Sequence, residues 1–167
     1  MADPQTIFGQ ADAAAVELAE ALNDATFSLE VSATRTFVRR IEIGDVPAVG
    51  EAVGIQVIPT YEQTDSVGLS GQYDDLYGVT LVIQQQVAGD GETQVPLLLR
   101  LRSEIIELLC GTTLTTTAAV HGYARARVQS VRHGQEGLYD LARLESENVF
   151  YSALTIVYKA AALRRNQ

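Results

Sequence analysis

The fold is decided by the stretch Glu147-Asn148-Val149-Phe150-Tyr151-Ser152-Ala153-Leu154-Thr155-Ile156-Val157-Tyr158-Lys159 near the end of the chain. Over twelve of these residues, bulky side chains alternate with small or polar ones, which is the side-chain period of a β-strand. A strand needs a sheet to join, because an isolated strand is not stable in water. We therefore expect the fold to close only when this last strand pairs.

Two segments have the composition and spacing of helices. Residues 11–22 are rich in Ala, Glu and Leu, which are strong helix formers. Residues 95–109 carry an apolar stripe at helical spacing, formed by Leu98, Leu101, Ile105 and Leu109. The sequence predicts one helix over each segment.

Four further segments have the period of strands, namely 27–37, 55–59, 77–87 and 120–131. Between them, the polar residues 62–75 predict a flexible loop, and 42–54 a loop or short helical turn. Residues 133–147 predict another loop, with one helical turn at 139–144. The expected order is α-β-β-β-α-β-β. It favours an α+β fold in one domain over residues 1–167, with a mainly antiparallel sheet of about five strands and two helices packed on one face.

Composition limits the classes of protein to which the chain can belong. Hydrophobic residues make up 47% of the chain and charged residues 20%, values typical of a globular domain. No apolar run approaches the roughly 18 residues of a membrane helix, and the N-terminal residues lack the pattern of a signal peptide. We expect no membrane association. A single cysteine, Cys110, excludes an internal disulfide and fits a reducing compartment.

The net charge of −9 is unevenly distributed. No Lys or Arg occurs between Ile41 and Leu99, and this base-free stretch holds nine acids: Glu42, Asp45, Glu51, Glu62, Asp65, Asp74, Asp75, Asp90 and Glu92. Such a field disfavours nucleic-acid binding. The acids either form a solvated face or meet basic residues of a neighbouring copy in self-association.

The sequence offers little material for catalysis. His121 and His133 lie at opposite ends of a predicted strand, without a nearby cysteine at metal-ligand spacing. Cys110 ends an amphipathic helix, where we expect a buried, inert thiol. Asp74 and Asp75 are adjacent and would point apart on an extended backbone. We expect no catalytic residues, no cofactor and no metal site, and hence no enzyme.

The best positional indication of a partner is the pair Arg125 and Arg127. Their spacing of two places both on one face of a predicted strand. That face is either exposed to solvent or packed against the acids of another subunit.

Taken together, these segments resemble the tail-terminator, or tail-completion, proteins of long-tailed bacteriophages. The resemblance lies in the order of elements. An Ala-rich helix leads into Ala21-Leu22-Asn23-Asp24-Ala25-Thr26-Phe27-Ser28, and an Arg-bearing strand then ends near Phe37. The strand Ile55-Gln56-Val57-Ile58-Pro59 follows, then the strand from Tyr77 to Gln86 before the second helix, then Leu138-Tyr139-Asp140, and last the strand from Phe150 to Lys159. In that family the last strand commonly begins Phe, any residue, Ser and ends in Tyr and a base. The run Thr112 to Thr117 and the long acidic stretch depart from the family pattern.

The resemblance implies a structural virion protein that forms a ring, usually a hexamer, at the head-proximal end of the tail tube. Such a ring ends tube polymerisation and offers a docking surface for the head connector or stopper protein. The implied place is the virion neck, after assembly in the host cytoplasm. DNA would pass through without specific binding.

Within this framework, two groups of residues are candidate sites. Arg125, Arg127, Arg164 and Arg165 are candidates for a subunit interface, the last two because residues 160–167 follow the final strand, which we interpret as an edge. Glu62, Asp65, Asp74 and Asp75 are candidates for an acidic loop facing the lumen or the tube, where they would repel phosphate.

Three alternatives stay open. The chain could be a head-completion or stopper protein, or a tail-tube subunit, which we would expect to have a long hairpin arm and to polymerise alone. It could also be an α+β domain that binds a small ligand.

Overall fold

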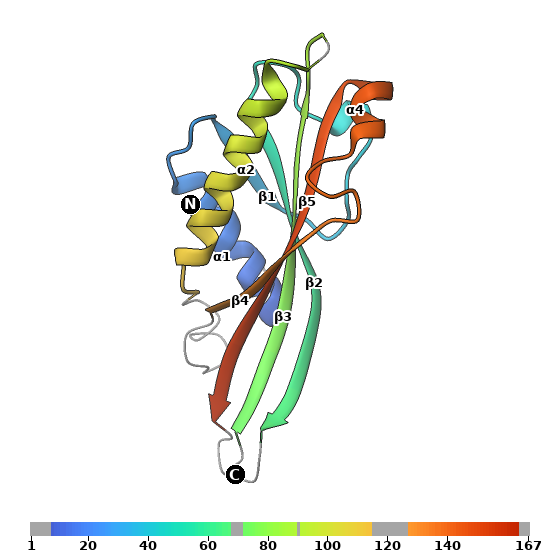
Figure 1. Cartoon of the computed structure of the whole chain (residues 1–167). Coiled ribbons are helices and arrows are strands. Elements are labelled where there is room, and N and C mark those ends of the chain that lie inside the picture. The colour runs from blue at the N-terminus through green and yellow to red at the C-terminus, as the bar shows by residue number, and fades with distance from the viewer. Residues whose placement is uncertain (1–7, 68–71, 90, 115–126, 164–167) are drawn as a thin grey trace.

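The computed structural model describes residues 8–67, 72–89, 91–114 and 127–163, with the backbone alone at 64–67, 72–75 and 161–163. In chain order its elements are α1 (Gln10–Asp24), β1 (Val31–Arg35), the 3-10 turn η1 (Ile43–Asp45), β2 (Val53–Val67), β3 (Gln72–Gln86), α2 (Gln94–Gly111), β4 (Arg127–His133), α4 (Leu141–Glu147) and β5 (Val149–Leu163). The strands form one sheet in the order β1-β2-β3-β5-β4 (Figure 1).

The sheet is mixed, which corrects part of the sequence prediction. Strands β2, β3, β5 and β4 pair antiparallel, whereas β1 pairs parallel to β2, from Val31 opposite Val53 to Arg35 opposite Val57. A parallel neighbour needs a long connection, and residues 36–52 supply it by crossing the sheet. A five-stranded, mostly antiparallel sheet is confirmed, but β1 is shorter than the strand predicted over 27–37.

Three helices are present in the described part of the chain, one more than predicted. The third, α4, spans Leu141–Glu147, a segment expected to form one turn within a loop. Its N-cap Asp140 accepts a hydrogen bond from the backbone N–H of Arg143, and its C-cap Asn148 adopts the left-handed conformation. These two short polar side chains suit the two ends of a helix and stabilise it despite its length.

The main core lies between one face of the sheet and helices α1 and α2, as the apolar stripes predict. The helices contribute Leu18, Leu22, Leu101 and Ile105 among others, all fully buried. In its middle, the rings of Tyr77 and Tyr158 stack with their centroids 5.7 Å apart. We call the sheet face turned away from these helices the outer face.

Strand β5 lies inside the sheet, between β3 and β4, and not at an edge. It pairs with β3 over fifteen residues, from Val149 opposite Gln86 to Leu163 opposite Gln72. Side chains on both of its faces are buried, including Phe150 toward the helices and Tyr151 on the outer face. The expectation that this strand closes the fold is confirmed, but its interpretation as an edge is wrong.

Strands β2, β3 and β5 continue past helix α1 as a three-stranded arm (Figure 1). We define the arm as residues 63–67, 72–76 and 159–163. The prediction of a flexible loop over 62–75 is therefore wrong, because 62–67 and 72–75 belong to β2 and β3. The residues of the arm are of mixed polarity, but they form strands because β3 pairs with β2 on one side and with β5 on the other.

The free edge of β1 is closed by a side chain. Asn23, near the end of α1, donates from Nδ2 to the Ala33 carbonyl at 2.9 Å and accepts from the Ala33 N–H at Oδ1 at 2.8 Å. The Asn23 amide thereby pairs with the N–H and the C=O of Ala33, as the backbone of a neighbouring strand would.

The N-terminus of α1 is held by two carboxylates. Asp12, 2% exposed, forms an ion pair with Arg35 of β1 at 2.7 Å, and its Oδ2 accepts from the Phe8 N–H. Glu62 of β2 accepts from the Ala11 N–H at 2.8 Å. Anionic groups are favoured at this end of a helix, so α1 is joined to both β1 and β2.

We predict that breaking the Asp12–Arg35 pair strongly destabilises the fold. Asp12→Asn leaves the mostly buried Arg35 guanidinium without its carboxylate, so we expect unfolding free energy to fall by about 3–5 kcal/mol. Urea denaturation measures the loss. The double variant Asp12→Asn, Arg35→Met should lose less than the sum of the single variants; additive losses would contradict the pairing.

A second stability prediction concerns Tyr158, whose buried hydroxyl has no hydrogen-bond partner among the described residues. Burial, with Tyr77 nearby, raises the pKa of Tyr158 well above its ordinary value. Tyr158→Phe removes an unsatisfied polar group, so we expect stability to rise by about 1 kcal/mol in thermal or urea unfolding. Tyr151→Phe is the matched control, because the Tyr151 hydroxyl accepts a bond from Arg39 and its loss should not stabilise. A destabilised Tyr158→Phe would contradict this account.

Candidate interaction surface

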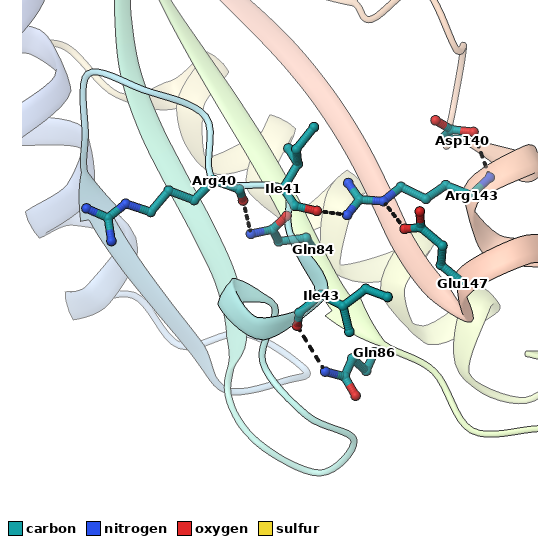
Figure 2. A network of polar contacts seen from close by, with 8 residues as sticks. All are labelled: Arg40, Ile41, Ile43, Gln84, Gln86, Asp140, Arg143 and Glu147. Atoms are coloured by element: carbon teal, nitrogen blue, oxygen red, sulfur yellow. Dashed lines mark hydrogen bonds and ion pairs between the residues drawn. The ribbon is translucent and has the colours of Figure 1, made fainter.

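The connection from β1 to β2 crosses the outer face and is fixed there by two glutamines. Gln56 of β2 accepts from the Arg40 N–H at 2.9 Å and donates to its carbonyl at 2.6 Å. Gln84 of β3 donates to the same carbonyl at 3.0 Å (Figure 2). Gln84 alternates with Ile83, which faces the helices, so its amide points to the opposite side. The backbone at Arg40 is thus held across two strands.

Helix α4 holds the next part of this connection. Figure 2 shows Arg143 extending from α4 to the Ile41 carbonyl, to which its Nη2 donates. The same guanidinium pairs with Glu147 at 2.8 Å and lies over the Tyr151 ring, 5.3 Å from its centroid. Arg143 is positioned by the Asp140 cap of its own helix. One guanidinium thereby joins α4, β5 and the crossing segment.

Apolar side chains gather in the exposed part of this region. Nine large apolar residues are exposed in the described part of the chain, and seven lie on the crossing segment or at the start of α4. We call three of these residues the outer apolar surface, because they lie on the part of the crossing segment that is bonded to Gln56, Gln84, Gln86 and Arg143: Val38, Ile41 and Ile43. Phe37 instead packs edge-on against Phe8, and Leu141 lines a pocket with Val95 and Leu99 of α2. Val38 is 69% exposed. Gathered apolar exposure of this kind marks protein contacts more often than scattered single residues do.

A polar pocket of about 400 Å³ lies under the crossing segment. Its lining includes Ser32 and Thr34 of β1, Arg40 and Asp45 of the crossing segment, and Gln84. The Gln84 Oε1 is buried and has no hydrogen-bond partner in the described part of the chain. The pocket offers donors and acceptors of mixed charge, without a feature that selects one ligand.

A buried arginine connects α2 to the other end of the sheet. Arg102 is 4% exposed; its Nε donates to Ser152 Oγ at 3.0 Å and its Nη2 contacts His133 Nδ1. Ser152 Oγ in turn donates to the Leu138 carbonyl at 2.6 Å. Desolvation lowers the pKa of Arg102. Sequence analysis missed this network, because the apolar stripe of α2 gives no sign that an arginine beside it is buried.

The four predicted acidic positions are brought together only partly. Glu62 is bound to the N-terminus of α1. Asp65 of β2 lies opposite Asp74 of β3 in the strand register, and Asp75 lies opposite Thr64. All four thus belong to strands in or beside the arm. No contact in the structure shows whether they face a lumen or a tube.

Of the predicted basic positions, Arg127 alone lies in the described part of the chain. It begins β4, is exposed, and pairs in register with Lys159 of β5. Arg125, Arg164 and Arg165 lie outside the described residues. Cys110 is exposed, so the expectation of a buried thiol is wrong.

The outer apolar surface and the guanidinium groups beside it have the composition of a contact region. Within the described residues, no three His, Cys, Asp or Glu side chains are grouped as metal ligands would be. None of the helices described is long and apolar enough to cross a membrane. Apolar side chains beside guanidinium groups have the composition of protein–protein contacts.

Comparison with known proteins adds no identity. No family model matches the chain, and no curated protein matches it.

We predict that Arg143 keeps the crossing segment in place. Arg143→Met removes the bond to Ile41 and the pair with Glu147, so we expect about 1–2 kcal/mol of destabilisation. Hydrogen exchange over residues 39–47 should accelerate by roughly tenfold, since 1.4 kcal/mol corresponds to that factor. Arg100→Met is the matched control, because Arg100 is largely exposed and pairs only along α2 with Glu104. Unchanged exchange in Arg143→Met would show that the segment is held by other contacts.

Proposed function

We propose that this protein is a structural subunit of the neck of a long-tailed bacteriophage. Its copies form a ring, usually a hexamer, on the head-proximal end of the tail tube. The ring ends tube polymerisation and provides the docking surface for the head connector or stopper protein. The protein catalyses no reaction and carries no cofactor in this role.

The observation that carries the proposal is the outer apolar surface. Three large apolar side chains, Val38, Ile41 and Ile43, remain exposed on a segment that hydrogen bonds hold against the sheet. A rigid surface of this kind loses little conformational entropy when a partner covers it. Together with the resemblance in the order of elements, it favours an assembling subunit over an isolated domain.

The acidic arm fits the passage of DNA. Asp65, Asp74 and Asp75 lie on its strands, and no Lys or Arg occurs from Ile41 to Leu99. Carboxylates facing a lumen would repel phosphate groups and keep DNA from binding to the wall. A ring structure in which these residues lie on the outer wall would contradict this part of the proposal.

A tail-tube subunit is the second candidate, because one observation favours it. The strands β2 and β3 are fifteen residues each and form a hairpin that runs past the body of the molecule. A long hairpin arm is what we expect of a tube subunit. The two candidates differ in their products, since a tube subunit polymerises alone and a terminator stops at one ring.

We predict single six-fold rings in negative-stain electron microscopy of the purified protein, either free or on the ends of tail tubes. Long tubes formed by this protein alone would establish the second candidate instead. A protein that stays monomeric and does not bind tube ends would contradict both.

The role of the outer apolar surface is tested by placing a charge in it. Val38→Lys should reduce ring formation, because a buried ammonium in an interface is costly, while the melting temperature stays unchanged. Leu97→Lys is the matched control, since Leu97 is exposed on α2, away from this surface. Equal ring formation by Val38→Lys and the unaltered protein would remove the surface from the interface.

A further inference from the structure

Among the residues that the structure describes, the sheet has two edge segments that no further strand covers. Strand β1 covers only Val53–Val57 of β2, so residues 58–67 of β2 have no neighbouring strand on that side in the described part of the chain. At the opposite side of the sheet, β4 (Arg127–His133) is the last described strand. The edge of β1 differs, because the Asn23 side chain closes it. Open edges are templates for pairing with another chain.

The two open edges lie at the same height along the sheet. Arg127 of β4 is opposite Lys159 of β5, Lys159 is opposite Leu76 of β3, and Leu76 is opposite Gln63 of β2. A second copy placed beside the first without a shift along the strands would therefore bring its Gln63 level with Arg127. A contact between two unlike edges is head-to-tail, and it makes a ring when the rotation between neighbouring copies closes, and an open filament when it does not.

Strand directions also permit this arrangement. From β2 through β3 and β5 to β4, every neighbouring pair is antiparallel. The four strands therefore alternate in direction, and β4 runs opposite to β2. A second copy in the same orientation would present its β2 antiparallel to the first copy's β4. The alternation would then continue around a ring without interruption.

The edges carry opposite charges. Residues 58–67 of β2 include Glu62 and Asp65 and no base, whereas β4 includes Arg127 and Arg132 and no acid. Asp65 is two residues farther along β2 than Gln63, which would lie level with Arg127 of the neighbouring copy. Asp65 would therefore be a diagonal neighbour of that Arg127 across the ladder. Pro59 lacks an N–H donor and lies next to a break in register, so useful pairing begins after it.

We propose that the β2 edge of one copy pairs with the β4 edge of the next, with Asp65 placed beside Arg127. Repetition of this contact joins the sheets of all copies into one continuous wall. The inference rests on the proposed ring and specifies how its subunits join. It assigns Asp65 to the interface and leaves for the lumen whichever of Asp74 and Asp75 lies on the inward face of the wall, since the two alternate along β3.

A disulfide between the two positions tests the geometry. In a Cys110→Ser background, we would make Asp65→Cys together with Arg127→Cys. Within one copy, β3 and β5 separate these positions by three strand spacings, roughly 14 Å, which is too far for a disulfide. Oxidation should therefore give a ladder of covalent oligomers up to the closed ring on a non-reducing gel. Each single-cysteine protein should give dimers at most.

Charge reversal tests the electrostatic part. Asp65→Arg and Arg127→Asp should each weaken association by roughly fivefold per interface, measured by sedimentation at low salt. The two reversals combined in one chain should restore it. Arg100→Asp is the matched control, because it makes the same change of charge on α2 and should leave association unchanged.

The outcomes separate this inference from the proposed function. Rings without the covalent ladder, and without an effect of the charge reversals, would overturn the edge pairing and leave the ring proposal intact. Failure to form rings, alone or on tube ends, would overturn both. A ladder that continues beyond the mass of a closed ring would indicate an open filament and overturn the proposed closed wall.

Discussion

The ladder between β3 and β5 is the interaction on which the rest of the structure depends. It pairs fifteen residues of each strand and joins segments more than sixty positions apart in the sequence. Among the described strands, β4 pairs with β5, and α4 packs against β5, so the positions of both depend on the entry of β5 into the sheet. Because this pairing is long-range, its loop-closure entropy must be overcome before its hydrogen bonds and apolar contacts stabilise the protein.

The second constraint is the anchoring of α1 at its N-terminus. Asp12 and Glu62 both contact the first turn, and each also connects the helix to a different strand. Their negative charges match the positive end of the helix dipole. Since Glu62 lies where β2 enters the arm, the same carboxylate that holds the helix also fixes the base of the arm.

Sequence patterns predicted the parts of this fold that follow from local periodicity. The apolar stripe of α2 and the alternation in β5 were sufficient to place both elements, because their burial repeats with the period of the backbone. The arm was missed because Glu62 to Asp75 is polar, and its strands are stabilised by neighbours that local composition does not reveal. The parallel pairing of β1 was missed for the same reason, since strand direction depends on the path of the connection.

The candidate surface was predictable only in its charges. The base-free stretch and Arg127 are visible in the sequence. The placement of Val38, Ile41 and Ile43 depends instead on Arg143 and on glutamines that bind backbone groups far away in the chain. Such side-chain-to-backbone contacts leave no periodic trace.

The distribution of charge also has a structural consequence. The base-free stretch includes all of β2 and β3, whereas β4 carries Arg127 and Arg132 and no acid. The bases on the β2 side of the sheet are Arg35 of β1 and Arg39 and Arg40 of the crossing segment, so the separation of charge concerns the edges of β2 and β4. Net charge of −9 keeps copies apart at long range, whereas this lateral separation favours one relative orientation at short range. Two copies that meet through identical edges, β2 with β2 or β4 with β4, bring like charges together. Two copies that meet through the β2 edge of one and the β4 edge of the other bring opposite charges together. In the proposed ring, this pattern would disfavour contacts between like edges and favour contacts between the β2 edge of one copy and the β4 edge of the next.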